Sequence, residues 1–304
     1  MTRLICAGEC MVELSDQGGG LYRRGFAGDT FNTAWYARHL LPQTWEVDYA
    51  TCVGRDAVSD DMLAEMAAAG IGTQAVRRHL DRTVGLYMIA LEDGERRFSY
   101  WRGQSAARTL ADDPEWLAKA FEGADAIYFS GITLAILPPE GRAAFLDAAG
   151  AARARGATVA FDTNLRPLLW EDENAMRHGL SAAGRAASLV LPSFDEDGAL
   201  FADADPAACA RRYGDGGADL VAVKNGRAPV TLWSRERGLA EVPTVPAPRV
   251  VDTTAAGDSF GAGFLTALLT GAGPEEAVAR ACALAAHVIG ARGALVPPPD
   301  PQQS

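Results

Sequence analysis

The chain of 304 residues carries a formal net charge of −11 at pH 7, with 48% hydrophobic and 22% charged residues. Its length allows a sizeable core in one large domain, and its composition is ordinary for a globular enzyme. The negative charge argues against nucleic acid and against an anionic membrane as partners, so an anionic substrate would need Arg or Lys placed locally.

The cysteines and histidines limit the kinds of site that the chain can contain. The five cysteines are scattered and form no C-x-x-C pair, which fits reduced thiols and a cytoplasmic location. The four histidines are isolated from one another, which argues against a zinc site, and no other set of metal ligands is visible.

The first quarter of the chain mixes strand and helix patterns. Residues 4–7 predict a short buried strand, and the alternating run 11–14 followed by three glycines at 18–20 predicts a hairpin. A strand at 46–53 and an amphipathic helix at 57–69 follow.

The segment from Arg24 to Ala34 leads into a predicted helix that runs to about Leu40, with Asp29 or Thr30 as its N-cap. One interpretation is an ordinary junction between a loop and a helix. The other is a site for a polyhydroxylated ligand, to which the segment would contribute Gly28, Asp29 and Asn32.

A second β-like region follows. Two alternating runs, 83–90 and 96–102, flank Asp93-Gly94, a dipeptide typical of hairpin turns. Together the two hairpins predict a small sheet, from about residues 11–27 and 83–103, inserted into an α/β body. Such a sheet can serve as a lid over a site or as an arm for dimerisation, and the two roles are compatible.

Alternation in the second hairpin places Tyr100 and Arg102 on one face and Trp101 on the other. An Arg beside a Tyr suits a ligand with a carboxylate, because guanidinium binds carboxylate in a bidentate manner. The alternative is an ordinary solvated Arg.

From residue 111 onward, strands and helices alternate. Strands are predicted at 126–130, 157–161, 188–191 and 219–223, with a helix at 139–154, which indicates a parallel, doubly wound sheet. Ligands bind beyond the carboxyl ends of such strands. The residues of interest that follow these strands are Ile132, Asp162, Asn164, Arg166, Ser193, Lys224 and Gly226. For residues 162–166, turn chemistry alone is an alternative explanation.

The most informative segment is Asp252 to Phe260, which follows a β-rich run at 242–251 and enters a predicted helix at 261–270. Phe260, Phe264 and Leu268 would share one face of this helix. Its unpaired N–H groups and dipole can hold an anion, and small side chains let the backbone approach that anion.

Asp258 lies at this helix entrance. A carboxylate repels an anion, so it suits a base that deprotonates a hydroxyl for attack on a bound phosphate. An acid favoured by the helix dipole in an ordinary tight turn fits the local physics equally well. The segment is not a Walker A loop, because no G-x-x-x-x-G-K-[ST] occurs in the chain.

Asp252-Thr253-x-x-Ala256-Gly257-Asp258 resembles the C-terminal signature of the ribokinase-like (PfkB) carbohydrate kinases, with Ala255 where most members have Gly. The segment Gly28-x-x-x-Asn32-x-Ala34 resembles their N-terminal signature, with Ala27 in place of its first Gly. Two matches in the right order, at opposite ends of the chain, are far more specific than one. The Ala-Ala-Gly-Asp form, and Tyr100-Trp101-Arg102 before small residues, resemble the 2-keto-3-deoxygluconate kinase branch.

This resemblance covers essentially the whole chain and implies a single ribokinase-like domain over residues 1–304, an α/β fold with a doubly wound, mostly parallel sheet and an inserted β lid. It implies ATP-dependent phosphorylation of 2-keto-3-deoxygluconate at its terminal hydroxyl. Asp258 would be the base, and the N–H groups of Ala255, Ala256 and Gly257 would stabilise the transferring phosphoryl group. The sugar contacts implied are Gly28, Asp29, Asn32, Tyr87, Tyr100, Arg102, Ile132, Arg166 and Asp258. The nucleotide contacts implied are Asn164, Ser193, Lys224, Gly226 and the same three residues, 255–257.

Mg²⁺ is expected from the chemistry of ATP. The family also makes K⁺ near Asp252 a candidate, and a homo-oligomer, such as a dimer through the lid, is expected. The alternatives are related sugar kinases acting on fructose, ribose or 2-keto-3-deoxygalactonate; a neutral sugar needs no Arg, whereas the galactonate epimer differs only at one hydroxyl. A sensing module without activity is disfavoured by Asp258, and a Rossmann dehydrogenase by the lack of G-x-G-x-x-G after the first strand.

Overall fold

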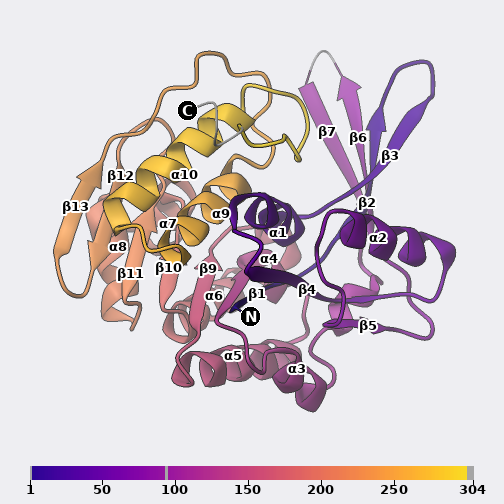
Figure 1. Cartoon of the computed structure of the whole chain (residues 1–304), viewed down its shortest axis with the longest axis horizontal. Coiled ribbons are helices and arrows are strands. Elements are labelled where there is room, and N and C mark those ends of the chain that lie inside the picture. Colours follow the sequence, from indigo (N-terminus) through magenta and orange to yellow (C-terminus); the bar gives the residue numbers. More distant parts are fainter. Residues whose placement is uncertain (1, 93–94, 300–304) are drawn as a thin grey trace.

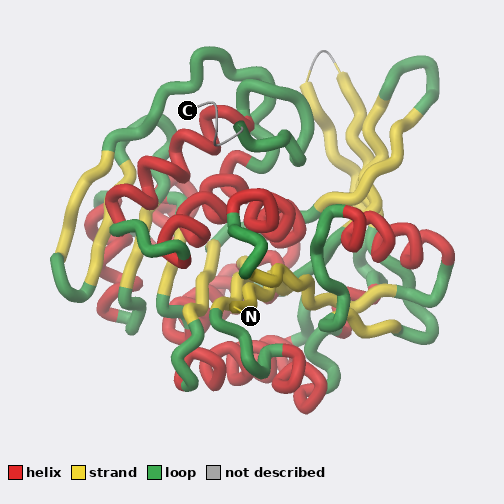
Figure 2. The backbone as a smooth tube through the Cα atoms, viewed as in Figure 1, coloured by secondary structure: helices red, strands yellow, loops and turns green. Residues whose placement is uncertain are grey.

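The computed structural model describes residues 2–92 and 95–299. Its centre is a sheet with the strand order β13-β12-β11-β10-β9-β8-β1-β4-β5 (Figures 1 and 2). From β11 to β5 all neighbours are parallel, while β12 and β13 are antiparallel additions at one edge. The strands are β1 Thr2–Ala7, β4 Trp45–Val53, β5 Val76–Arg78, β8 Ala126–Ser130, β9 Thr158–Asp162, β10 Leu189–Leu191, β11 Leu220–Val223, β12 Val230–Ser234 and β13 Gly238–Val242.

Helices cover both faces of this sheet, which confirms the predicted doubly wound architecture (Figure 1). Helices α1, α2, α9 and α10 pack on one face, and α3 to α8 pack on the other. Their bounds are α1 Asp29–Leu40, α2 Ala57–Ala68, α3 Pro114–Ala120, α4 Gly131–Ala135, α5 Pro139–Ala154, α6 Glu173–Ala186, α7 Phe194–Phe201, α8 Pro206–Asp215, α9 Ala256–Leu269 and α10 Pro274–Val288. No helix in the described ranges has the length and apolar character needed to cross a bilayer.

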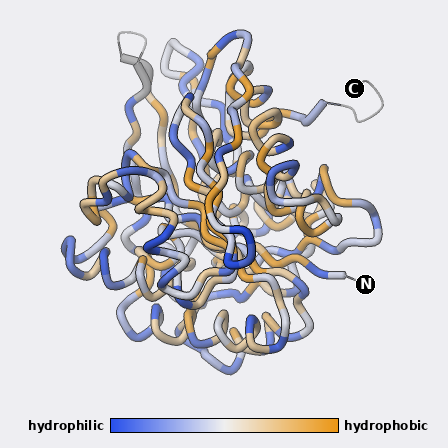
Figure 3. The backbone as a smooth tube through the Cα atoms, turned by 90° about the vertical axis from the view of Figure 1, so that its left-hand side faces the viewer, coloured by the Kyte–Doolittle hydropathy of each residue, from blue (hydrophilic) through white to orange (hydrophobic). Residues whose placement is uncertain are grey.

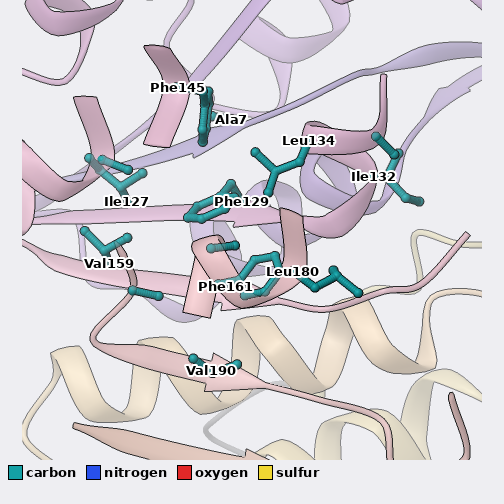
Figure 4. Close-up of a cluster of buried hydrophobic side chains, with 14 of the residues drawn as sticks. Ala7, Ile127, Phe129, Ile132, Leu134, Phe145, Val159, Phe161, Leu180 and Val190 are labelled. Carbon is teal, nitrogen blue, oxygen red and sulfur yellow. The ribbon is translucent and has the colours of Figure 1, made fainter. Parts of the chain in front are cut away.

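The core follows from the period of two in the strands. In β8, Ile127 and Phe129 face one layer of helices while Tyr128 faces the other, and all three are buried. Strands buried on both faces are therefore continuously hydrophobic, and Figure 3 shows the hydrophobic segments gathered along the central strands. Phe129 lies between Phe145 and Phe161, with ring centroids 5.1 and 5.0 Å away (Figure 4).

A second sheet, in the order β3-β2-β6-β7, projects from the body at the upper right of Figure 1. Its strands are β2 Met11–Asp16, β3 Tyr22–Ala27, β6 Leu86–Glu92 and β7 Glu95–Trp101. Both hairpins are antiparallel, and they join through a parallel pairing of β2 with β6. The predicted small sheet is thus present, although β6 begins at Leu86 rather than Thr83. The predicted turn at Asp93-Gly94 lies outside the described residues.

Two local predictions were wrong. Helix α1 already begins at Asp29, its N-cap is Gly28, and no side chain caps it, because the Asp29 carboxylate accepts a hydrogen bond from Asn164 instead. The run 242–251 is not a strand beyond Val242, where β13 ends. Prolines at 243, 246 and 248 lack the N–H that a sheet ladder needs, and this explains the end of the strand.

The buried aromatic stack gives a stability prediction. Phe129→Ala should lower the free energy of unfolding by about 3–5 kcal/mol, because it removes a fully buried ring between two others. Urea denaturation followed by circular dichroism measures this loss. Leu80→Ala, which removes a side chain that is 68% exposed, is the control and should stay within about 0.5 kcal/mol of the wild type. A similar loss in both variants would contradict the assignment of Phe129 to the core.

Candidate active site

A cavity of about 880 Å³ lies at the carboxyl ends of β1, β8, β9, β10 and β11, beneath the small sheet. This is the edge at which doubly wound sheets bind ligands. The structure brings to it all the residues singled out from the sequence except Gly226. They are Gly28, Asp29, Asn32, Tyr87, Tyr100, Arg102, Ile132, Asn164, Arg166, Ser193, Lys224, Ala255, Ala256, Gly257 and Asp258.

Gly226 lies apart from them, in the exposed turn that follows β11, with a φ of 57°. It is not in the wall of the cavity.

A second cavity, of about 1030 Å³, lies between the small sheet and residues 250–254 and 292–295.

The N-terminus of α9 opens into the first cavity. Its N-cap, Ala255, has φ 59° and ψ 18°, a left-handed conformation that glycine adopts without strain and that explains why related signatures have Gly there. The N–H of Ala256 donates to the carbonyl of Thr253 at 3.2 Å. Within the described part of the chain, no acceptor pairs with the N–H groups of Ala255, Gly257 or Asp258. These three donors, with the dipole of the helix, form an anion-binding surface.

Asp258 lies in the first turn of α9, and its Oδ2 accepts a hydrogen bond from Nδ2 of Asn32 at 2.8 Å. The pKa of Asp258 is raised to about 7, chiefly by burial and also by the nearby Asp29, while the Asn32 hydrogen bond lowers it. A carboxyl group that titrates near neutral pH is well matched to proton transfer.

Close backbone contacts hold α1 against the cavity. A Cβ atom at Gly28 would lie 2.1 Å from the carbonyl oxygen of Glu9, so only glycine fits at this position. The amide oxygen of Asn32, Oδ1, is buried and has no hydrogen-bond partner among the described residues. It is therefore available to accept a hydrogen bond from a ligand hydroxyl.

Asp162, at the end of β9, connects three parts of the site. Its Oδ1 accepts from the N–H of Asn164 at 3.2 Å, and its Oδ2 accepts from Nζ of Lys224 at 2.7 Å. Asn164, with a φ of 30°, in turn donates from Nδ2 to Asp29 at 2.8 Å. The Lys224 Nζ lies 3.8 Å from the position a Cβ atom would take on Gly257, so a cation is held beside the N-terminus of α9.

The small sheet contributes an aromatic wall. The rings of Tyr87, Phe98 and Tyr100 lie about 6 Å apart and line the cavity, whereas Trp101 does not, as the alternation predicted. The hydroxyl of Tyr87 donates to Glu13, so it is the ring of Tyr87 that faces the cavity.

Two arginines line the same cavity, and each has a carboxylate partner. Arg102 forms a buried ion pair with Glu9, and Nη1 of Arg166 lies 3.6 Å from Oε1 of Glu196. Both guanidinium groups are thus placed where a ligand carboxylate could reach them.

Several lining residues were missed from the sequence. They are Glu9, Met11, Phe98, Pro167, Leu168, Leu169, Asp195, Glu196, Thr253, Thr254 and Ala294, while Asp162 is a residue of interest from the sequence without an assigned contact. Their position directly after a predicted strand was an available signal for Glu9 and Asp162. Glu196 is three residues beyond the strand-end Ser193 and comes back to the cavity only because α7 begins there.

Residues 1–301 match the family described as pfkB family carbohydrate kinase. The chain belongs to this family. As a pfkB kinase, it is a sugar kinase, and the match extends over both sheets and every lining residue named above.

Curated relatives of this pfkB kinase support a narrower comparison. It is 38% identical over 296 residues to the 2-dehydro-3-deoxygluconokinase of Dickeya dadantii (strain 3937), which covers 95% of each chain. It is 37% identical over 301 residues to the 2-dehydro-3-deoxygluconokinase of Escherichia coli (strain K12), which covers 97% of each. Among solved structures, a fructokinase with bound ATP from Xylella fastidiosa is similar with a TM-score of 0.84 and 25% identity, over 96% of this chain and 93% of that one.

The environment of Asp258 predicts a pH dependence. If its ionised form is the active one, kcat/KM should rise with pH through about 7 and level off above it, because protonation removes the base. Asn32→Ala should move this acidic limb to higher pH, since the hydrogen bond that favours the charged form is lost. Initial rates from pH 5 to 9 measure both profiles. If the acidic limb does not move in Asn32→Ala, it belongs to a group other than Asp258.

Proposed function

We propose that this pfkB kinase transfers the γ-phosphoryl group of ATP to the terminal hydroxyl of 2-keto-3-deoxygluconate, which is 2-dehydro-3-deoxygluconate, to give the 6-phosphate. The observation that carries the proposal is the cavity itself, where a carboxyl group of near-neutral pKa lies beside free N–H groups and two arginines line the same wall. The names of the full-length curated relatives agree with it.

In this proposal Asp258 accepts the proton of the sugar hydroxyl as that oxygen attacks phosphorus. Asn32 orients the carboxylate through the hydrogen bond to Oδ2. The N–H groups at the start of α9 and the Lys224 ammonium stabilise the negative charge on the transferring phosphoryl group.

ATP is the proposed donor, and the acidic and amide oxygens of the site fit Mg²⁺. Asp162, Asn164 and Glu196 all line the cavity on the side of Lys224, and Mg²⁺ prefers one or two carboxylates together with water and phosphate oxygens. When bound, Mg²⁺ would neutralise charge on the phosphate oxygens. Ser193 and Gly226 remain proposed contacts of the nucleotide.

The sugar acid is proposed to lie between the aromatic wall and α1. Gly28, Asp29, Asn32 and Ile132 would contact its polyhydroxylated chain, while Tyr87 and Tyr100 would cover it. Arg102 and Arg166 supply the local positive charge that a protein of net charge −11 needs for an anionic substrate.

The small sheet is proposed to act as a lid and as the contact surface of a homodimer. The exposed side chains of Phe98, Tyr100 and Trp101 on β7 provide apolar area for such a contact. K⁺ is proposed to assist near Asp252, whose two carboxylate oxygens accept from Thr254 and from the N–H of Gly293. A cytoplasmic location fits the five free, buried cysteines.

Asp258→Asn tests the base. Turnover should fall by about 10²- to 10⁴-fold while ATP affinity is retained, because the amide cannot accept the proton.

The same variant should be more stable than the wild type at pH 8. The pKa of Asp258 is raised on folding, so ionising it costs stability above the unfolded pKa of about 4, and the gain should shrink as the pH falls from 7 to 4.

Steady-state kinetics, nucleotide titration and urea denaturation provide these three readouts. Asp215→Asn is the control: this exposed residue at the end of α8 lies near the amino end of β11, opposite the cavity. Near-normal kcat in Asp258→Asn would remove Asp258 from the mechanism.

Substrate choice is tested by ADP release from Mg-ATP with 2-keto-3-deoxygluconate, its galactonate epimer, gluconate, fructose and ribose. The proposal expects turnover of the keto-deoxy acids and a KM for the acid that rises at least about tenfold in Arg102→Ala. Glu171→Gln, which removes a carboxylate paired with Arg142 outside the cavity, should leave that KM unchanged. Turnover confined to fructose or ribose would keep the kinase assignment and reject the sugar acid.

A further inference from the structure

Glu9 is a buried carboxylate that no predicted role uses. It lies between the end of β1 and the start of β2, where the chain leaves the large sheet for the small one, and it is 2% exposed. Its Oε2 accepts from Nε of Arg102 at 2.8 Å and also pairs with Nη2 of the same guanidinium. Arg102 follows β7 and is 9% exposed, so this ion pair is largely shielded from solvent.

The second oxygen of this carboxylate indicates that the pair does not serve only to stabilise the fold. Oε1 of Glu9 is buried and has no hydrogen-bond partner among the described residues. A buried acceptor without a partner destabilises the fold, and a carboxylate that only braced the structure would have both oxygens paired. The interactions of the Glu9 carboxylate are therefore directed to Arg102.

The contact also selects one edge of the guanidinium. Glu9 occupies the edge formed by Nε and Nη2, and no described residue accepts a hydrogen bond from Nη1. The edge formed by Nη1 and Nη2 is thereby left for another bidentate partner, and both residues line the cavity.

Glycine packing fixes the carboxylate in this place. A Cβ atom at Gly85 would lie 2.7 Å from Oε1 of Glu9 and 3.2 Å from Cβ of Arg102. A Cβ atom at Gly28 would meet the Glu9 carbonyl oxygen at 2.1 Å. Glu9, the partner of Arg102, is thus packed against Gly85, directly before β6, and against Gly28, directly before α1.

We infer that Glu9 is a positioning residue that sets the specificity for a sugar acid: it holds Arg102 by one edge so that the other edge faces the substrate carboxylate. This inference rests on the proposed function. Glu9 contacts neither the reacting hydroxyl nor the phosphates in this scheme, so its removal affects binding of the acid rather than the chemical step.

A double-mutant cycle of Glu9→Gln and Arg102→Ala tests the inference, with KM for 2-keto-3-deoxygluconate, KM for ATP, kcat and the melting temperature measured for each protein. Glu9→Gln keeps the shape of the side chain but leaves the buried guanidinium without a counter-charge, so Arg102 moves away from its position. KM for the acid should rise at least about tenfold, with kcat within about threefold and KM for ATP unchanged. In the Arg102→Ala background, Glu9→Gln should cause no further rise.

Gly85→Ala disturbs the pair by another route, because its Cβ crowds both Oε1 of Glu9 and Cβ of Arg102 while both charges remain. It should raise KM for the acid in the same direction. Glu171→Gln is the matched control, since it breaks the Arg142–Glu171 pair, which lies outside the cavity, and should leave every kinetic constant unchanged.

An unchanged or lower KM for the acid in Glu9→Gln would overturn the inference, and so would rises that add in the double variant, because Glu9 would then act independently of Arg102. Both results leave the proposed function intact as long as the wild-type enzyme phosphorylates the acid. A wild-type enzyme that accepts only neutral sugars overturns the proposed function and this inference together.

Discussion

The parallel pairing of the central strands is the constraint on which the rest of the structure depends. Parallel neighbours need a crossover, so each connection between the successive central strands β1, β4, β5, β8, β9, β10 and β11 contains at least one helix. The same pairing brings the carboxyl ends of β1, β8, β9, β10 and β11 to one edge. Short segments from five distant parts of the sequence meet there, and α1, α9 and the small sheet supply the remaining side chains of the cavity.

Three carboxylates of the cavity are paired with cations, whereas Asp29 and Asp258 accept hydrogen bonds from the neutral amides of Asn164 and Asn32. Asp162 is held by Lys224, Glu9 by Arg102 and Glu196 by Arg166. For Asp258 the direct partner is the neutral amide of Asn32, and Lys224 acts on it only at longer range. Because burial and neighbouring carboxylates then dominate, the pKa of Asp258 rises toward neutrality while the paired carboxylates serve to position their partners. An acidic protein can in this way present cations to an anionic substrate and keep one carboxyl group ready to accept a proton.

The small sheet is coupled to this cavity by contacts at the point where it joins the body. Glu9 lies at that junction, Gly85 and Gly28 pack around it, and Arg102 returns to it from the end of β7. Farther along the sheet, the rings of Phe98 and Tyr100 are exposed, whereas Tyr87 is buried. Arg102, the residue proposed to bind the substrate carboxylate, is therefore held where the small sheet joins the body, while Phe98 and Tyr100 belong to the projecting part of that sheet.

The sequence alone determined the elements whose signals are local. The short hydrophobic runs of β8, β9 and β11, the hairpins of the small sheet, the length of α5 and the loop entering α9 were all readable, because each depends on neighbouring residues in the sequence. Local signals failed where a distant partner intervened: Asp29 has the chemistry of an N-cap, but Asn164, 135 residues away, takes its carboxylate. The run 242–251 is β-rich but punctuated by prolines, and β13 ends at Val242, directly before the first of them.

Only the tertiary structure decided which charges meet. Glu9 and Arg102 are 93 residues apart, Asn32 and Asp258 are 226 apart, and Asp162 and Lys224 are 62 apart. No spacing rule links such positions, because each pair forms only when the packing of strands and helices brings distant segments together. The pKa of Asp258 likewise depends on burial and on neighbours from other strands and helices, so the residue type and motif indicated a base while the packing around it set its proton affinity.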